Sequence, residues 1–252
     1  LFRSRSKTAY GDDISPHIVF ADEKNFDTNG LKWNLEGAKN GEKKFETSRA
    51  LSGTSATVSY GDFDRVVETD DIYTLKAQMT DLAGNEADGS IQFSVNRFGS
   101  NFMVRDARQY QANGGYLATA PEVIVDEINV TGAEEKNHGV TVTRGLDTKN
   151  LQQQRAKDAT AGGFFIDSAL ESYGWSHYTY HVGTGNYKSA DDSETYDDGN
   201  YHVAVNSQDI VKNNNNSANY YDPSTHNVNS AEVAFTLDTT APIVENLHFE
   251  EI

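Results

Sequence analysis

Hydrophobic and polar positions alternate in two long segments of the chain, residues 70–85 and residues 198–213. In each segment a tyrosine follows an Asp-containing turn, and the alternation ends at an Asp eight positions later, from Tyr73 to Asp81 and from Tyr201 to Asp209. Side chains that repeat every second residue lie on one face of an extended chain. The pattern therefore predicts a half-buried β-strand that occurs twice.

A second alternating run follows each of these segments, at residues 91–95 and at residues 233–237. Each pair of runs predicts the last two strands of a β-sandwich. We expect Phe93 and Phe235 to point into the two cores. Tyr73 and Tyr201 fit the tyrosine corner, in which the ring lies in the core and the hydroxyl bonds a nearby backbone group.

The prolines indicate where one unit ends and the next begins. Three of the four prolines, Pro16, Pro121 and Pro242, stand just before a β-branched run. Proline is tolerated at the first residue of a strand because it donates no ladder hydrogen bond. The predicted division is a tail at 1–12, a sandwich at 13–98, an ordered linker at 99–116, a second sandwich with long polar loops at 117–238, and the start of a following module at 239–252.

Short strand candidates separated by Gly, Asn and Asp fill both units, and no crossover connections of the kind that parallel strands need are evident. The predicted fold is all-β, with two tandem antiparallel β-sandwiches. Residues 149–161 are predicted to form either a short helix or a loop insertion. The segment 97–116 is too rich in aromatic and aliphatic residues for a free tether, so we expect it to dock against a sandwich. The predicted strands are 18–20, 31–35, 56–60, 72–80 and 90–96, and then 123–130, 140–144, 164–166, 176–182, 201–208 and 232–237.

Charge and composition narrow the classes of function. The net charge is −17, with Lys plus Arg 21 against Asp plus Glu 38. Such a surface repels nucleic acids and anionic lipids, so neither nucleic-acid binding nor membrane contact is expected. There is no cysteine, which excludes disulfides and thiolate chemistry. No apolar run approaches the roughly 18 residues of a membrane span.

Oxygen-bearing side chains give two weak candidates for calcium sites, and no other cofactor is expected. Carboxylate and amide oxygens are the ligands that calcium prefers, but the spacing of an EF-hand loop is missing. Asp and Asn in turns are more simply explained by hydrogen bonds to the local backbone. The candidates are Asp70, Asp71, Asp81 and Asn85, and then Asp191, Asp192, Glu194, Asp197 and Asp198.

Neither a zinc site nor an enzyme is predicted. His177 and His181 lie on one side of a predicted strand, while His202 belongs to a strand expected in the other sheet, so these histidines do not converge. Nucleophile-elbow, phosphate-loop and metal motifs are missing from the sequence. An intramolecular Lys–Asn bond at Asn96 would need a buried lysine beside it, and the first strand of that unit has none.

Several motifs carry a resemblance to a known family. In the first unit they are Asp71-x-Tyr73-x-Leu75-x-Ala77, Asp81-x-Ala83-Gly84-Asn85 and residues 93–100, and in the second they are residues 140–144, 174–180, 198–201 and 233–242. In these motifs the chain resembles bacterial immunoglobulin-like domains, which occur in tandem in cell-surface and adhesin-type proteins of Gram-positive bacteria. The resemblance implies that the two antiparallel β-sandwiches are tandem immunoglobulin-like domains. The second unit departs from the family pattern because Asp209-Ile210-Val211-Lys212-Asn213 stands where the turn Asp-x-Ala-Gly-Asn is expected, and an insertion follows.

The resemblance implies a non-catalytic structural or adhesive stalk segment of an extracellular protein, either attached to the cell surface or secreted. Its expected partners are adjacent repeats of the same chain and a host or neighbouring-cell protein or glycan. Two alternatives stay open: a carbohydrate- or protein-binding module, and an accessory region of a secreted multidomain enzyme. A binding module would present exposed aromatic residues at one tip, and the candidates are Trp175, Tyr220 and Tyr221.

Overall fold

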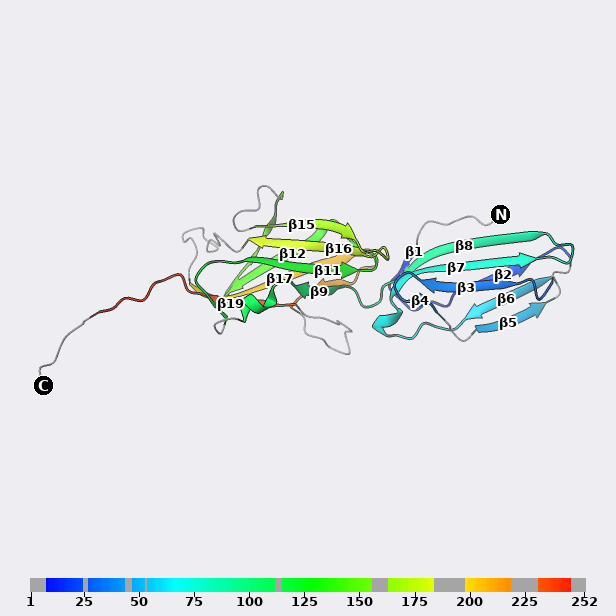
Figure 1. Cartoon of the computed structure of the whole chain (residues 1–252), viewed down its shortest axis with the longest axis horizontal. Coiled ribbons are helices and arrows are strands. Elements are labelled where there is room, and N and C mark those ends of the chain that lie inside the picture. The colour runs from blue at the N-terminus through cyan, green and yellow to red at the C-terminus, as the bar shows by residue number, and fades with distance from the viewer. Residues whose placement is uncertain are drawn as a thin grey trace, which may run out of the picture.

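The chain forms two β-sandwiches that lie end to end in a computed structural model (Figure 1). The first sandwich comprises strands β1 to β8, and the second comprises β9 to β19. The structure describes residues 8–24, 27–43, 47–52, 54–111, 115–155, 163–183, 198–218 and 231–245. Within these residues no helix is long and apolar enough to cross a membrane.

The first sandwich has the strand order of an immunoglobulin-like domain, with strands C, F and G in one sheet and B, E and D in the other. Strand β1 adds to the first sheet by pairing in parallel with β8. In spatial order, the first sheet is β1 (Thr8–Tyr10), β8 (Glu86–Val95), β7 (Asp71–Thr80), β3 (Lys32–Gly37) and β4 (Gly41–Glu42). The second sheet is β2 (His17–Ala21), β6 (Ser55–Tyr60) and β5 (Thr47–Ser52).

The second sandwich repeats this order. One sheet is β10 (Tyr116–Leu117), β19 (Val233–Leu237), β17 (Gly199–Asp209), β12 (Ala133–Arg144) and β13 (Asp147–Asn150), with β18 (Asn214–Asn216) paired to β17. The other is β14 (Gln152–Gln153), β15 (Gly163–Leu170), β16 (Ser176–Gly183), β11 (Glu122–Asn129) and β9 (Asn101–Val104). Short 3-10 turns, η1 (Val67–Thr69) and η2 (Ala107–Tyr110), stand before β7 and after β9.

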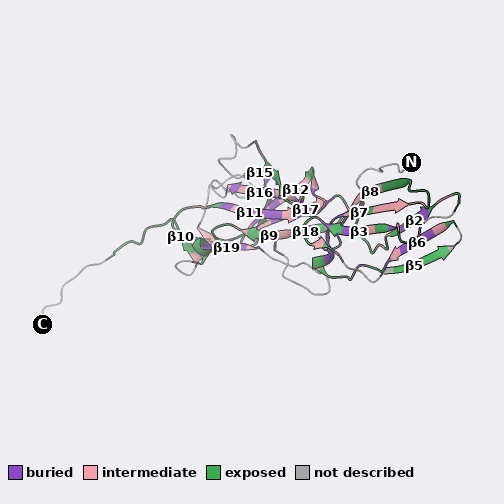
Figure 2. Cartoon of the chain, turned by 45° about the vertical axis from the view of Figure 1, so that its right-hand side comes forward, coloured by how far each residue is buried: buried purple, intermediate pink, exposed green. Residues whose placement is uncertain are grey.

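The two tyrosine strands occupy the same place in their sandwiches. Tyr73 pairs with Phe93, and their rings stack at 5.7 Å between centroids. Tyr201 pairs with Phe235 in the same register, with a ring distance of 5.4 Å. All four side chains lie in the cores, where buried residues alternate along the strands (Figure 2). The hydroxyl of Tyr73 donates to the carbonyl of Thr69 at 2.7 Å, which makes a tyrosine corner.

Several boundary predictions need correction because short polar strands give little periodicity. Thr8–Tyr10 form β1 and do not belong to a tail. The segment expected to link the units begins with β9, which pairs with β11 and is therefore part of the second sandwich. The docking expected for this segment is present, because Phe102 and Tyr110 lie in the second core.

The helix considered for residues 149–161 is absent where the structure describes that segment. Residues 149–150 belong to β13 and residues 152–153 to β14, both of which are extended. Leu151, between them, is buried in the core of the second sandwich. Burial of this leucine between two short strands favours the extended conformation over a helix.

Candidate functional site

The strongest concentration of buried polar groups lies where the two sandwiches meet. Residues 96–100 join β8 to β9, and we call this segment with the side chains around it the junction. Asn96, Asn129 and Asp209 are all 0% exposed. Buried polar side chains are costly unless they are hydrogen-bonded, so such a cluster indicates a specified geometry.

Asn96 is the central residue of the junction. Its Nδ2 lies 2.9 Å from Asp209 Oδ2, 3.0 Å from Asn129 Oδ1 and 2.8 Å from Thr131 Oγ1, so these three oxygens share its two N–H groups. Its backbone oxygen accepts from Asn213 Nδ2 at 2.9 Å. The end of the last strand of the first sandwich is thereby held by two different loops of the second.

Asp209 and Asn213 belong to the turn between β17 and β18, and the turn itself fixes their side chains. The backbone N–H of Asn213 donates to Asp209 Oδ1 at 2.9 Å, and Asn213 Nδ2 donates to Asp209 Oδ2, also at 2.9 Å. Lys212 has a φ of 76°, the left-handed conformation that such a turn requires. The second turn departs in sequence from Asp-x-Ala-Gly-Asn, as inferred, but Lys212 adopts the left-handed conformation that Gly84 has in the first turn.

A second contact across the junction joins Trp175 to Asp71. The indole Nε1 donates to Asp71 Oδ1 at 3.0 Å. The same carboxylate accepts from the backbone N–H groups of Lys39 and Asn40 and so fixes the turn between β3 and β4. The ammonium of Lys39 lies 4.3 Å from the centre of the Trp175 ring, a cation–π contact.

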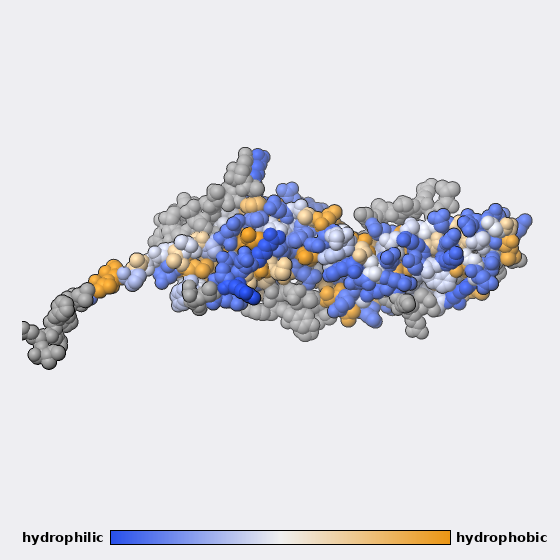
Figure 3. Space-filling model, in the orientation of Figure 1, coloured by the Kyte–Doolittle hydropathy of each residue, from blue (hydrophilic) through white to orange (hydrophobic). Residues whose placement is uncertain are grey.

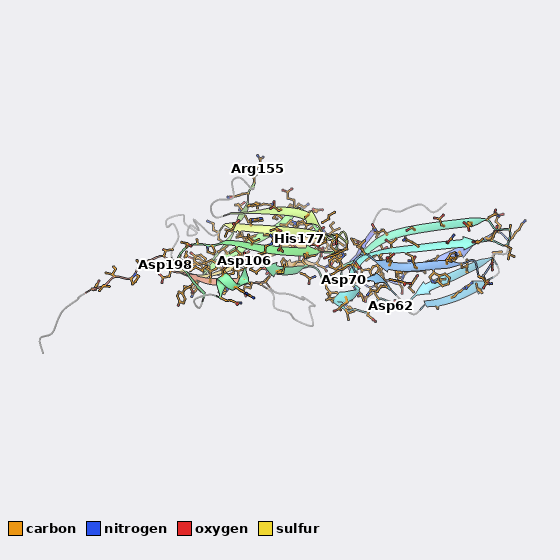
Figure 4. The ribbon with its side chains drawn as sticks, viewed as in Figure 1. Asp62, Asp70, Asp106, Arg155, His177 and Asp198 are labelled. Carbon is orange, nitrogen blue, oxygen red and sulfur yellow. The ribbon has the colours of Figure 1, made fainter. Side chains whose placement is uncertain are left out.

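Asp70 and Arg97 secure the chain as it leaves the first sandwich. Asp70 Oδ2 accepts from the backbone N–H groups of Arg97 at 2.6 Å and of Phe98 at 2.9 Å, and Arg97 Nε lies 3.3 Å from Asp70 Oδ1. Burial raises the pKa of Asp70 to about 6, against the lowering effects of those N–H groups and the guanidinium. Figure 4 labels Asp70 at the junction.

A buried carboxyl group connects the junction to the second core. Glu127 Oε1 accepts the hydroxyls of Ser100, at the junction, and of Ser207, while Oε2 accepts the hydroxyl of Tyr180. His138 Nδ1 contacts that same hydroxyl of Tyr180. Burial raises the pKa of Glu127 and lowers the pKa of His138 to about 4. Sequence reasoning missed this network because its members are scattered over β11, β12, β16 and β17.

A cavity of about 440 Å³ opens beside the junction. Its walls include Lys39 and Glu68 from the first sandwich and Met103, Asp126 and Trp175 from the second. Burial tends to raise the pKa of Asp126, but hydrogen bonds from Arg105, Thr179 and His177 outweigh it and lower the pKa. Asp71 accepts the indole N–H of Trp175 and Lys39 lies over the ring, so this N–H is already engaged and does not face a ligand in the cavity.

The structure places the residues that were predicted as binding or metal sites in different parts of the molecule. Trp175 is only 4% exposed and lies in the junction, so the expectation of an exposed aromatic at a tip is wrong for it. Tyr220, Tyr221, Asp191, Asp192, Glu194 and Asp197 lie outside the described residues. The strands of His177 and His202, β16 and β17, lie in different sheets, as expected.

The first calcium candidate does not form one site. Asp70 and Asp71 stand at the start of β7, whereas Asp81 and Asn85 follow its other end. Ten residues of strand span roughly 30 Å, which no single cation can bridge. Asp198, from the second candidate, accepts the N–H and hydroxyl of Thr239 and the hydroxyl of Thr240. In the part of the chain that is described, His, Asp and Glu form no group of three that could hold a metal.

No protein-family model and no curated protein matches the chain. Solved structures that resemble it include "Titin Ig tandem domains A164-A165", with 10% identity, coverage of 92% of this chain and 91% of that chain, and a TM-score of 0.36. Another is the "tetra-tandem repeat in extending region of large adhesion protein", with 15% identity, coverage of 90% and 50%, and a TM-score of 0.34. At these scores the fold assignment depends on the strand order described above.

Proposed function

We propose that this chain is a non-catalytic structural segment of a bacterial extracellular surface protein, a stalk that holds adhesive or catalytic domains away from the cell. In this proposal the surface protein belongs to a Gram-positive bacterium and is anchored to its wall. Neighbouring repeats contact both ends, and a host protein or glycan is bound by domains elsewhere. Residues 239–252 open the next repeat.

The observation that carries this proposal is the buried polar contact of Asn96 with Asp209 and Asn213. A flexible tether between domains is normally solvated and rich in Gly and Ser. Here the connecting residues are buried, and their amide and carboxylate groups are paired across the boundary. Hydrogen bonds are directional, so this interface fixes an angle between the sandwiches in a way that apolar contact alone does not.

The surface is consistent with a spacer. Figure 3 shows mainly hydrophilic residues along both sandwiches, with apolar residues scattered among them. A negative net charge of −17 keeps such segments soluble and mutually repelling. A stalk needs both properties, because its many copies stand close together on one surface.

The test is the relative orientation of the two sandwiches in solution. Residual dipolar couplings of the intact chain are expected to fit one common alignment tensor, and small-angle scattering to give one narrow distribution of lengths. Asn96→Ala is expected to separate the couplings into two tensors while both sandwiches stay folded. Asn200→Ala, an exposed asparagine in β17 far from the junction, is the matched control and should behave as the unmodified chain. Two independent tensors in the unmodified chain would contradict the stalk.

A further inference from the structure

The turn that receives Asn96 in the second sandwich has a counterpart at the free end of the first. This turn, Asp81-Leu82-Ala83-Gly84-Asn85, connects β7 to β8, as Figure 1 shows at the end remote from the junction. Asn85 donates its backbone N–H to Asp81 Oδ1 and its side-chain Nδ2 to Asp81 Oδ2, both at 2.7 Å. Asp209 and Asn213 make the same pair of bonds, atom for atom.

The backbones of the two turns also agree. The N–H of Asp81 donates to the oxygen of Asn85 at 2.9 Å, and that of Asp209 to the oxygen of Asn213 at 3.1 Å. Gly84 has a φ of 88°, close to the 76° of Lys212. The two groups by which this turn holds Asn96, a carboxylate oxygen and a side-chain amide four residues later, are therefore present in the first sandwich with the same local geometry. The other two partners of Asn96, Asn129 and Thr131, belong to a different loop.

The two turns differ in what covers them. The second is covered by the first sandwich, and Asp209 is 0% exposed. In the first turn Asn85 is exposed, whereas its counterpart Asn213 is half-buried. Leu82 and its counterpart Ile210 are both exposed, at 71% and 54%. Apolar atoms are visible at this end of the molecule (Figure 3).

We propose that the turn Asp81–Asn85 is a docking site for another β-sandwich module of this kind, which inserts an asparagine that follows its last strand. This inference rests on the stalk function proposed above and names the chemistry of one partner. Asp81 Oδ2 accepts from the carboxamide N–H of the incoming asparagine. Asn85 Nδ2 donates to its backbone oxygen, as Asn213 does for Asn96.

The position equivalent to Asn96 in the second sandwich shows why the partner is not a second copy of this chain. Because Val95 and Leu237 hold the same register position relative to Phe93 and Phe235, the residue that follows Leu237, Asp238, corresponds to Asn96. A carboxylate at that place would meet the carboxylate of Asp81 without a proton to share, and like charges at contact repel. The partner that fits carries an amide there.

The two sandwiches also share the way in which the chain is held after the last strand, which supports a common mode of end-on contact. Asp198 stands three residues before Tyr201, as Asp70 stands before Tyr73, and each binds the backbone just after its last strand. Asp70 is covered by the second sandwich, whereas Asp198 lies at the far end, as Figure 4 labels it. The first sandwich thus contains both halves of the junction contact, the receiving turn and the asparagine Asn96, whereas the second contains the receiving turn and has Asp238 at the position of Asn96.

The decisive experiment gives the second turn, whose partner is Asn96, the sequence of the first turn. Ile210→Leu, Val211→Ala and Lys212→Gly together give the second turn the sequence of the first within the intact chain. The residual dipolar couplings of this variant are expected to keep one common tensor, and its Asn96 side-chain amide to stay protected from solvent exchange. Adding Asn213→Ala to this variant is expected to separate the tensors and to expose that amide.

The outcomes separate this inference from the proposed function. If the unmodified chain shows one tensor and the exchanged turn shows two, with both sandwiches folded, the first turn cannot receive an asparagine and the inference is overturned while the stalk stands. Two tensors in the unmodified chain would overturn the stalk itself. Sedimentation of the unmodified chain is expected to show a monomer, and head-to-tail oligomers blocked by Asp81→Ala would show that a second copy is the partner after all.

Discussion

The indole N–H of Trp175, in the second sandwich, donates to the carboxylate of Asp71, in the first, at 3.0 Å. Asp71 is 0% exposed, and its Oδ2 accepts from Lys39 and Asn40 in the turn between β3 and β4, while its Oδ1 also accepts from the backbone N–H of Ile72. One carboxylate therefore organises a loop of its own sandwich and also accepts a hydrogen bond from the neighbouring sandwich. Gly37 allows this arrangement, since a Cβ there would lie 2.4 Å from Asp71 Oδ2.

Trp175→Phe tests this bond while keeping an aromatic ring beside Lys39. We expect the free energy of unfolding to fall by about 1–3 kcal/mol, the range for losing a hydrogen bond to a charged group. The angle between the sandwiches is expected to become more variable in small-angle scattering. Trp33→Phe, in β3 and away from the junction, is the control for replacing a tryptophan. Equal effects of the two substitutions would argue against a special role for Trp175.

Arg97 is the buried cation of the junction, and its replacement should be costly. Its side chain is 0% exposed and pairs with Asp70 and Asp13. Arg97→Ala leaves the carboxyl of Asp70 buried without its cation, which typically costs about 3–5 kcal/mol. Lys76→Ala removes an exposed pair with Glu36 and is expected to cost about 0–1 kcal/mol. Chemical denaturation measures both, and a loss below about 1 kcal/mol for Arg97→Ala would contradict the structural role.

The left-handed residue of the two turns allows a reciprocal test. Lys212→Gly is expected to stabilise the second sandwich by about 0.5–1 kcal/mol, because the left-handed conformation costs a non-glycine residue roughly 1–2 kcal/mol and the greater freedom of unfolded glycine returns part of it. Gly84→Ala should destabilise the first sandwich by a similar amount. Nothing lies within 4 Å of a Cβ at Gly84, so this effect is purely conformational. Thermal unfolding of the two variants should shift in opposite directions.

The parts of the fold that follow from the sequence are those with strong periodicity. The tyrosine strands and the phenylalanine strands beside them alternate over many residues, so the local pattern alone is enough to infer which of their side chains face the core. Strands β1, β9 and β10 are short and partly polar, and their pattern is typical of a tail or a linker. Their pairing depends on contacts with distant strands, which the local sequence does not show.

The junction is hidden in the sequence for a different reason. Asn96, Asp209 and Asn213 are residue types that normally satisfy the local backbone in turns, and a single sequence does not show when a second domain covers them. The Asp eight residues after each tyrosine and the Asn four residues later show in the sequence that the two turns correspond. Their shared backbone conformation does not show in the sequence, because Lys212 adopts the left-handed conformation without being a glycine.

The buried side chains of Glu127 and His138 are expected to make stability depend on pH in opposite directions: the contribution of Glu127 is lost as the pH rises, and that of His138 as the pH falls. The pKa of Glu127 is raised, so the folded chain holds this proton more tightly than the unfolded chain. Its contribution to stability is present below the unfolded pKa of about 4.3 and is lost as the pH rises through the folded pKa. The pKa of His138 is lowered to about 4, so its contribution is present above about pH 6.5 and is lost as the pH falls toward 4. Asp209 faces Glu127 and raises its pKa further.

Glu127→Gln removes the titratable carboxyl group and keeps a side chain of the same size at this position. The serine hydroxyls of Ser100 and Ser207 both donate to Oε1, which the amide oxygen replaces. One new N–H group donates to the oxygen of Tyr180, whose hydroxyl then donates to His138 Nδ1. We expect this variant to be more stable than the unmodified chain at pH 8, by about 1.4 kcal/mol for each unit by which the pKa is raised. The acid-side loss due to His138 should remain. Glu134→Gln, on the surface, is the control, and an unchanged pH profile for Glu127→Gln would show that the carboxyl does not titrate as its burial requires.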